Sequence, residues 1–302
     1  MKKIYLLGGK LITSMMLLLA WNSSQQFGLR SEVVPIQNSS QLKNIRYEQR
    51  ILPQSIVHIL LIPPNSKYLI VPALSTKLIH LEEFTTQYKA LAILNGGFFD
   101  PVNQKTTSTV VLQKQLVANP RNNERLINNP NLKPYLDKIF NRTEFRRYQC
   151  GQNIRYDIVL RSEKSLPGCQ LIDALGAGPQ LLPQLTLEPE GFVDPINKRD
   201  AIGSNQPNAR TAVGIKSDRT IILVMVAQKS DSPGNSGMSL PAVANLMKSL
   251  GAEKAMNLDG GSSSSLYYQG KFFYGKLDRQ GNPIKRPVKS VLLVQEIVKE
   301  SK

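Results

Sequence analysis

Short apolar runs separated by polar turns make up most of the chain, and they have the length of β-strands. Residues 55–62 and 67–74 flank the turn residues 63–66, a pattern that predicts a strand, a turn and a second strand. Residues 211–216 and 219–227 give the clearest hairpin pattern. Because such runs recur to the end of the chain, sheets are expected to form most of the fold.

The clearest helical pattern covers residues 239–251. Four apolar residues between positions 243 and 250 recur at the spacing of one helical face. Ser239 fits the N-cap, and Gly251 fits the position just after the helix. With many strands and few helices, the chain is expected to be an α+β protein. Its mixed or antiparallel β-sheets should be covered by a minority of helices in a single domain.

The first 21 residues predict export. Lys2 and Lys3 precede an apolar stretch, and residues 11–21 have the length of a signal-peptide core, although no small-residue cleavage site follows. Eleven residues are too few to cross a bilayer alone, which needs about 20. The segment is therefore expected to be a signal peptide or an N-terminal membrane anchor, and the protein to be periplasmic, secreted or membrane-anchored.

Composition divides the remainder into a linker and one domain. Residues 22–44 are polar and are expected to form the linker, and residues 45–302 the domain, with a basic insertion at 120–170 that is in part helical. Cys150 and Cys169 both lie in this insertion. In an oxidising compartment they are expected to form a disulfide.

The balance of charges excludes some functions and favours others. The chain has 38 Lys and Arg against 22 Asp and Glu, a net charge of +16. Two histidines and two cysteines cannot build a three-histidine or four-cysteine metal site. No cofactor is predicted, and the sequence leaves open whether a divalent cation binds. Without a stacking or recognition motif, the basic stretches at 121–164 and 271–302 favour an acidic polysaccharide or membrane surface over nucleic acid.

Three polar segments at strand ends carry the candidate chemistry: residues 95–100 (NGGFFD), 208–214 (NARTAVG) and 257–263 (NLDGGSS). Each alone is typical of a tight turn. Together, the planar fork of Arg210, the strand-end carboxylate of Asp259 and the glycine backbone suit an anionic sugar or a phosphate ester. A structural ion pair between Arg210 and Asp259 is the alternative.

Five motifs in order are similar to those of the phosphodiester glycosidase family. They are NGGFF, GAGPQLL, ARTAVG, GNSGMSLPAVANLMKSLGA and MNLDGGSSSS, between about residues 90 and 275. The chain departs from the family pattern at Ala209, where proline is usual, and at Ser262, where a third glycine is common. The resemblance implies a hydrolase that cleaves a sugar-1-phosphodiester at the anomeric carbon, and the first 21 residues imply that it is exported.

The resemblance also implies roles for individual residues. Asp259 would act as base or nucleophile, Arg210 would bind the departing phosphate, and Asp100 is a second candidate carboxylate. A serine nucleophile is disfavoured because the chain lacks G-x-S-x-G. A non-catalytic protein that binds an anionic glycan during envelope or exopolysaccharide assembly is the other hypothesis. The candidate substrate-binding residues are Asn95, Gly96, Gly97, Thr211, Gly260, Gly261, Ser262 and Ser263.

Overall fold

The computed structural model describes residues 44–64 and 66–297, all within one unit of the chain, residues 38–302. The predicted export segment and nearly all of the predicted linker lie outside the described residues. Every helix within the described part is too short or too polar to cross a membrane.

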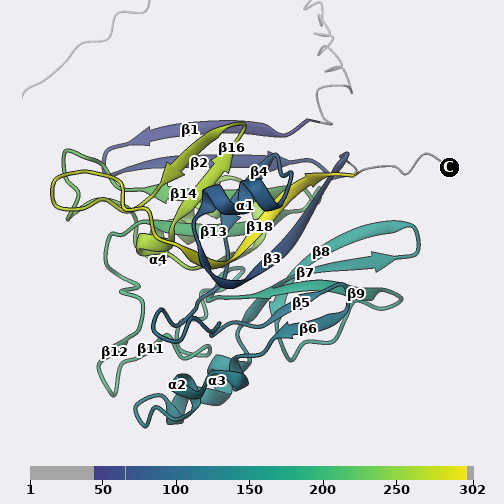
Figure 1. Ribbon diagram of the computed structural model, residues 1–302, viewed down its shortest axis with the longest axis horizontal. Coiled ribbons are helices and arrows are strands. Elements are labelled where there is room, and N and C mark those ends of the chain that lie inside the picture. The colour runs from purple at the N-terminus through teal and green to yellow at the C-terminus, as the bar shows by residue number, and fades with distance from the viewer. Residues whose placement is uncertain (1–43, 65, 298–302) are drawn as a thin grey trace, which may run out of the picture. The chain divides into compact units, whose positions relative to one another are not determined.

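A six-stranded antiparallel sheet forms the centre of the fold, and its outer face is covered by helix α4 (Leu240–Ser249) (Figure 1). Val57, Val224 and Ala212 of the sheet pack against Val243 and Met247 of the helix. In spatial order the strands are β1 (Arg46–Leu52), β2 (Ser55–Ile62), β14 (Ile221–Ala227), β13 (Arg210–Lys216), β15 (Ala252–Asn257) and β10 (Gln180–Leu182).

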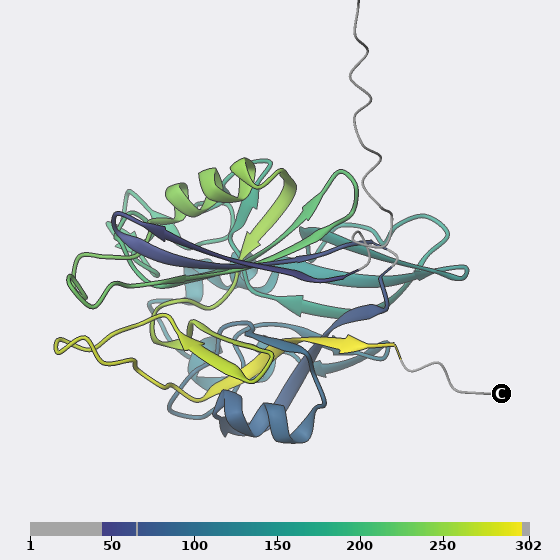
Figure 2. The same ribbon diagram turned by 90° about the horizontal axis from the view of Figure 1, so that it is seen from above.

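A second, five-stranded sheet lies against the inner face of the first, and Figure 2 shows the two sheets between α4 on one side and α1 (Leu81–Gln87) on the other. Leu60, Leu223 and Met225 of the first sheet share a core with Leu94 and Leu292 of the second. In spatial order the second sheet contains β17 (Lys271–Tyr274), β16 (Ser265–Tyr268), β4 (Ala92–Asn95), β18 (Val288–Glu296) and β3 (Tyr68–Ile79).

The predicted basic insertion is in part helical, as expected, and its remaining residues contribute to a third sheet. In spatial order this sheet contains β6 (Gln115–Ala118), β5 (Val110–Leu112), β9 (Gln170–Gly176), β7 (Thr143–Cys150) and β8 (Asn153–Leu160). The predicted disulfide between Cys150 and Cys169 is present. Within the described residues, the short elements are α2 (Glu124–Ile127), α3 (Leu136–Phe140), β11 (Val193–Asp194), β12 (Arg199–Asp200) and the 3-10 turns Pro120–Asn122, Lys133–Tyr135 and Gly261–Ser263.

Most of the predicted elements are confirmed, including the α+β class. The hairpin predicted over 211–227 is β13 and β14, and the predicted helix is α4. The Ser239 hydroxyl accepts a hydrogen bond from the Ala242 amide, and Gly251 has a positive φ of 85°. Helix α1 was not predicted, because seven residues are too few for a helical period to stand out.

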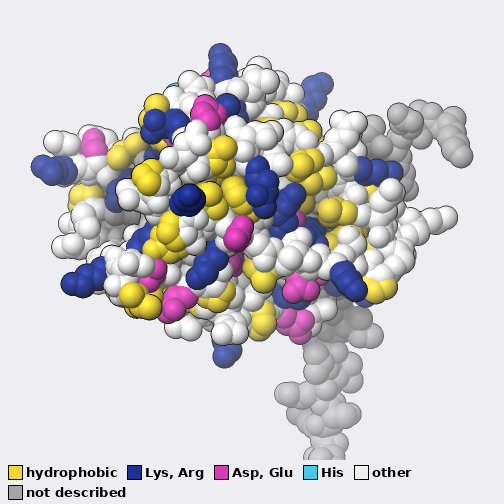
Figure 3. Space-filling view, turned by 90° about the horizontal axis from the view of Figure 1, so that it is seen from below, with side chains coloured by type: hydrophobic (Ala, Val, Ile, Leu, Met, Phe, Trp, Pro, Cys, Tyr) yellow, Lys and Arg dark blue, Asp and Glu magenta, His cyan; other side chains and the backbone are white. Residues whose placement is uncertain are grey.

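The basic stretch at 121–164 is not simply a solvated face. Arg146 is 4% exposed and is paired with Glu144 at 2.9 Å, while Arg161 binds the other oxygen of Glu144 at 2.8 Å. Arg147 is paired with Asp173. On the face of the molecule in Figure 3, Lys and Arg are interspersed with acidic and apolar side chains. Part of the basic excess therefore neutralises buried carboxylates within the third sheet.

Candidate functional site

The predicted strand-end segments meet at one end of the two main sheets. β13 and β15 are antiparallel neighbours, and Ala212 lies opposite Asn257, so Arg210 and Asp259 extend from the same end of the pair. The end of β4 joins them, because Asn95 Nδ2 donates to the Asp259 carbonyl at 2.6 Å. In return, the Asp259 amide donates to the Gly96 carbonyl at 2.9 Å.

A cavity of about 180 Å³ opens where these segments meet. All three predicted polar segments contribute to its wall, with Asp259 as its carboxylate. The residues that line it are Phe98, Ile202, Asn208, Arg210, Asn257, Asp259, Gly260 and Gly261. The convergence of separate strand ends on one cavity makes this the candidate site.

Asp259 is the residue best placed for chemistry. Burial raises the pKa of its carboxyl to about 6, while the Ser263 hydroxyl, the Arg286 guanidinium and the Gly260 amide act in the opposite direction. A carboxyl with a pKa near 6 is mostly ionised at neutral pH and still basic enough to accept a proton, as a general base requires. The cavity wall therefore holds a carboxylate suited to acid–base work.

Several buried polar atoms beside Asp259 have no partner among the described residues. Asn257 Nδ2 donates to the Gly178 and Leu258 carbonyls, but Asn257 Oδ1 accepts nothing. Ser263 Oγ likewise has no well-aligned hydrogen bond, but the Ser263 hydroxyl contributes to lowering the pKa of Asp259, and Ser263 does not line the cavity. Buried polar atoms usually have a partner, so Asn257 Oδ1, on a residue that does line the cavity, is the acceptor left for a bound ligand. Sequence reasoning gave Asn257 no role of its own, although it begins the segment NLDGGSS.

Arg210 binds backbone carbonyls rather than Asp259. Its side chain donates to the backbone carbonyls of Ile202 and Gly203 at 3.0 and 2.6 Å, and to two further carbonyls, those of Gln206 and Met238. Burial lowers its pKa to about 10, against the attraction of Asp200. No ion pair within 4.0 Å joins Arg210 to Asp259 in the described part of the chain, so the alternative of a structural pair is wrong. Arg210 holds the cavity wall in place.

Sequence reasoning missed two cations of the site: Arg286 acts on the Asp259 carboxylate, and Lys276 contacts the cavity residue Asn208. Arg286 donates to Ser262 Oγ at 2.8 Å and lowers the pKa of Asp259. Lys276 donates to the cavity residue Asn208 at 3.0 Å, and burial together with Arg210 lowers the pKa of Lys276. Their only sequence signal was membership of the basic stretch at 271–302. The site therefore combines one carboxylate with cations that can face an anionic group.

A third cation, Arg142, lies near the ring of Phe98, which lines the cavity. The Arg142 guanidinium lies 5.7 Å from the centroid of the Phe98 ring and 3.8 Å from that of Phe192. Burial lowers the pKa of Arg142 to about 9, so it remains charged at neutral pH. Arg142 comes from the predicted insertion, which thus contributes to the surroundings of the cavity.

Four of the predicted substrate-binding residues lie behind the cavity wall. Asn95 is fully buried and its Oδ1 accepts hydrogen bonds from Thr211 Oγ1 at 2.8 Å and from the Ser265 amide at 3.0 Å. A Cβ on Gly97 would lie 2.4 Å from the Gly176 carbonyl oxygen, and one on Gly96 would meet the backbone of β18. These residues are placed to position Asp259 rather than to touch a ligand. Gly260 and Gly261 do line the cavity, and Ser262 and Ser263 follow them.

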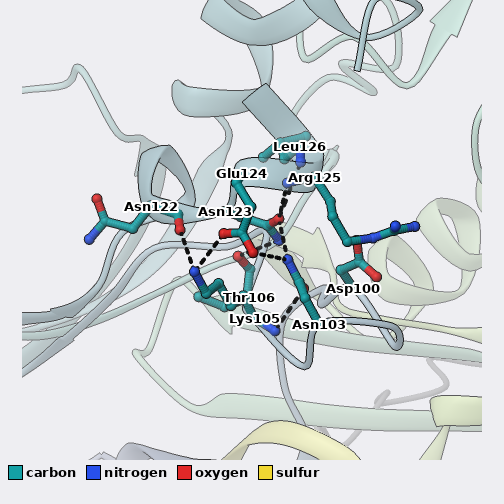
Figure 4. Close-up of polar contacts among 9 residues, drawn as sticks. All are labelled: Asp100, Asn103, Lys105, Thr106, Asn122, Asn123, Glu124, Arg125 and Leu126. Atoms are coloured by element: carbon teal, nitrogen blue, oxygen red, sulfur yellow. Dashed lines mark hydrogen bonds and ion pairs between the residues drawn. The ribbon is translucent and has the colours of Figure 1, made fainter. Parts of the chain in front are cut away.

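Asp100 is held in a different set of contacts (Figure 4). Its carboxylate accepts from Arg125 Nε and from the Val102 amide, both at 2.8 Å, and the Arg125 guanidinium contributes to lowering its pKa. Asn103, Lys105 and the neighbouring Glu124 extend the same network. Asp100 is not among the residues that line the cavity, so the geometry favours Asp259 of the two candidate carboxylates.

The histidines lie elsewhere. His58 accepts or donates a hydrogen bond with the Tyr47 hydroxyl at 2.8 Å, and burial lowers its pKa to about 4. His80 is the N-cap of α1. In residues 44–64 and 66–297, no three His, Cys, Asp or Glu side chains gather as a metal site would require.

Comparison with known proteins agrees with this fold. The catalytic domain of zebrafish N-acetylglucosamine-1-phosphodiester alpha-N-acetylglucosaminidase, auto-inhibited by its pro-peptide, superposes with a TM-score of 0.59 and 18% identity over 84% of this chain and 82% of that one. A Synechocystis protein described as hypothetical superposes with a TM-score of 0.55 and 20% identity, over 83% of this chain and 62% of that one. A Burkholderia pseudomallei protein described as exported superposes with a TM-score of 0.51 and 18% identity, over 80% of this chain and 74% of that one.

These solved structures establish the fold alone, because their identities are low, and no curated protein matches the sequence. The family model of phosphodiester glycosidases, however, matches residues 88–295, more than half of the chain. That span includes β4, β13, β15 and the whole cavity wall around Asp259. The chain belongs to the phosphodiester glycosidase family.

Proposed function

We propose that this protein is an exported glycosidase that hydrolyses a sugar-1-phosphodiester at the anomeric carbon. The observation that carries the proposal is the convergence of three strand-end segments on one cavity, where a carboxylate of raised pKa lies near cations. Family membership supports hydrolase chemistry, and the zebrafish relative is named for such a substrate. The Cys150–Cys169 disulfide and the exported Burkholderia relative support an extracytoplasmic location.

The reaction needs a base and a stabilised leaving group. Asp259 accepts a proton from water, the water oxygen bonds to the anomeric carbon, and the bond from that carbon to the phosphate oxygen breaks. The phosphomonoester leaves with the bonding electron pair. Arg286 and Lys276 are the cations placed to stabilise its charge. Because a phosphate leaves far more readily than an alkoxide, a second carboxylic acid is not required.

The unpartnered Asn257 oxygen and the Phe98 ring are the features of the wall that suit a sugar. Asn257 Oδ1 is an acceptor in the cavity wall and suits a sugar hydroxyl. Phe98 supplies an apolar ring at the same wall, with Arg142 behind it. The neutral sugar and the anionic phosphate would therefore meet different parts of the wall.

The test is release of free sugar from N-acetylglucosamine-1-phosphodiester and from UDP-sugars by the full chain. Asp259→Asn should abolish release without unfolding the protein. Asp100→Asn is the matched control, because Asp100 is an aspartate of the same domain bound to Arg125 outside the cavity wall, and it should retain release. Release that persists in Asp259→Asn and disappears in Asp100→Asn would overturn the assignment.

A non-catalytic glycan-binding protein is the second candidate, favoured by one observation: Asp259 is the single carboxylate among the residues that line the cavity. This candidate predicts no release from any of the substrates. It also predicts binding of a sugar phosphate that survives Asp259→Asn and weakens in Arg286→Gln. Equilibrium binding beside the release assay separates the two functions.

A further inference from the structure

A second and larger cavity, of about 390 Å³, lies at the other end of the central strands. Ile215 and Lys254 both line it and stand opposite each other in the pairing of β13 with β15. Arg210, at the start of β13, lines the cavity around Asp259 instead. At about 3.3 Å per residue, the five steps between Arg210 and Ile215 separate the two cavities by roughly 16 Å. They are therefore separate sites.

The floor of this second cavity is apolar. Ile62, Ile70, Ile215 and Ile221 line it and are themselves buried at the edge of the main core. The Tyr156 hydroxyl accepts a hydrogen bond from the Ile70 amide at 2.8 Å, which fixes β8 against β3 at the wall. Because these residues are held by the core, the floor is already formed without a ligand.

The rim of the cavity is cationic. Arg155, Arg219 and Lys254 line it with a single acidic residue, Asp157, and Lys254 is paired with Asp157 at 2.5 Å. Within the described residues, neither Arg155 nor Arg219 has an ion pair within 4.0 Å. Arg155 Nε is buried and has no hydrogen-bond partner. The guanidinium groups of Arg155 and Arg219 are therefore available to a ligand, whereas the Lys254 ammonium is paired with Asp157.

We propose that this cavity binds an amphiphilic anion, with its alkyl chain on the isoleucine floor and its phosphate or carboxylate on Arg155 and Arg219. The planar fork of arginine matches either head group. The volume falls within the range of small-molecule sites, about 300–1,000 Å³. Apolar burial and charge pairing act at opposite ends of such a ligand, so neither an alcohol nor a free phosphate satisfies both. The site goes beyond the proposed function and does not depend on it.

The test is calorimetric titration of the full chain with decyl phosphate and decanoate below their micelle concentrations, beside 1-decanol and inorganic phosphate. Both anionic amphiphiles should bind at least about tenfold more tightly than either partial ligand, since a hydrogen bond to a charged group contributes about 1.5–3 kcal/mol. Arg155→Gln with Arg219→Gln should weaken binding by at least about tenfold. Arg125→Gln, at an exposed arginine outside this cavity, and Asp259→Asn should leave it unchanged.

Three results would overturn the proposal. The first is equal affinity for decanol, which would remove the role of the arginines. The second is unaltered binding in the double variant, provided that thermal unfolding shows both proteins folded. The third is binding that is absent from the full chain and gained when residues 298–302 are deleted. That result would assign the cavity to the end of the chain beyond Ile297, which lines it.

Discussion

The Asn95 side-chain amide donates a 2.6 Å hydrogen bond to the backbone carbonyl of Asp259, 164 positions further along the chain. The Asn95 amide oxygen accepts two more, from Thr211 Oγ1 and from the Ser265 amide. One buried asparagine thus joins the ends of β4, β13 and β15 with the start of β16. The position of the candidate base depends on this side chain.

Asn95→Ala should lower both stability and turnover. It removes three buried hydrogen bonds, so the free energy of unfolding should fall by roughly 2–4 kcal/mol. Displacement of Asp259 should lower kcat by about 100-fold, because a misplacement of about 1 Å has effects of that size. Denaturant unfolding and sugar release measure the two effects.

Thr211→Val is the matched control for that variant. It removes one of the three hydrogen bonds and keeps a side chain of similar shape, so the loss should be about 1 kcal/mol. The acid limb of its pH–rate profile should stay in place. A Thr211→Val enzyme as impaired as Asn95→Ala would show that Asn95 does not act through Asp259.

Asp259→Asn should stabilise the protein at neutral pH. The folded pKa of about 6 is above the ordinary value of 3.8, so the folded state binds the proton more tightly than the unfolded state does. The ionised carboxylate therefore destabilises the fold, by roughly 1–3 kcal/mol above pH 6. This penalty disappears as the pH falls from about 6 to about 4.

The melting temperature of both proteins across pH 4 to pH 8 checks this expectation. The two curves should meet near pH 4 and separate by pH 7, with Asp259→Asn the more stable. A constant difference at every pH would contradict a titration of Asp259 near pH 6.

Arg286→Gln should move the acid limb of the pH–rate profile. Arg286 lowers the pKa of Asp259, so without its charge the base protonates at a higher pH. The limb near pH 6 should shift upward by about 0.5 unit or more. Lys285→Gln is the control, because Lys285 lies near Glu82 instead. An unmoved limb would remove Arg286 from the surroundings of the base.

Arg210→Lys tests whether this arginine shapes the cavity wall or binds phosphate. Lysine keeps the charge but cannot reach the carbonyls of Ile202, Gly203, Gln206 and Met238 together. The free energy of unfolding should fall by roughly 2–4 kcal/mol, and proteolysis within residues 202–206 should become faster. Unchanged stability with a raised KM would favour a direct phosphate contact.

Replacing both Cys150 and Cys169 by serine should lower stability without altering the site. The disulfide closes a loop of 19 positions, which by chain entropy corresponds to roughly 3 kcal/mol. Neither cysteine lines the cavity around Asp259, so the sugar-release KM should stay the same. A raised KM would show coupling between the third sheet and the site.

Local patterns were enough to predict several parts of this protein. The β13–β14 hairpin follows from two apolar runs around a turn, and α4 follows from apolar spacing with Ser239 and Gly251 at its ends. Such features depend on neighbours within a few residues, so the sequence displays them directly. The same holds for the strand-end position of Asp259, and the pairing of the cysteines followed from there being only two.

The partners of the charged side chains depended on the tertiary structure. The sequence suggested a phosphate or Asp259 as the partner of Arg210, yet its guanidinium donates to carbonyls of the loops that pack around it. Arg286 looked like one of many basic residues, yet it lies near Asp259. A guanidinium group donates to the oxygen atoms that packing places within reach. These oxygens can belong to residues far away in the chain, so the sequence does not show which they are. The sequence by itself determined the elements and the candidate carboxylate, and packing alone decided which cations face it.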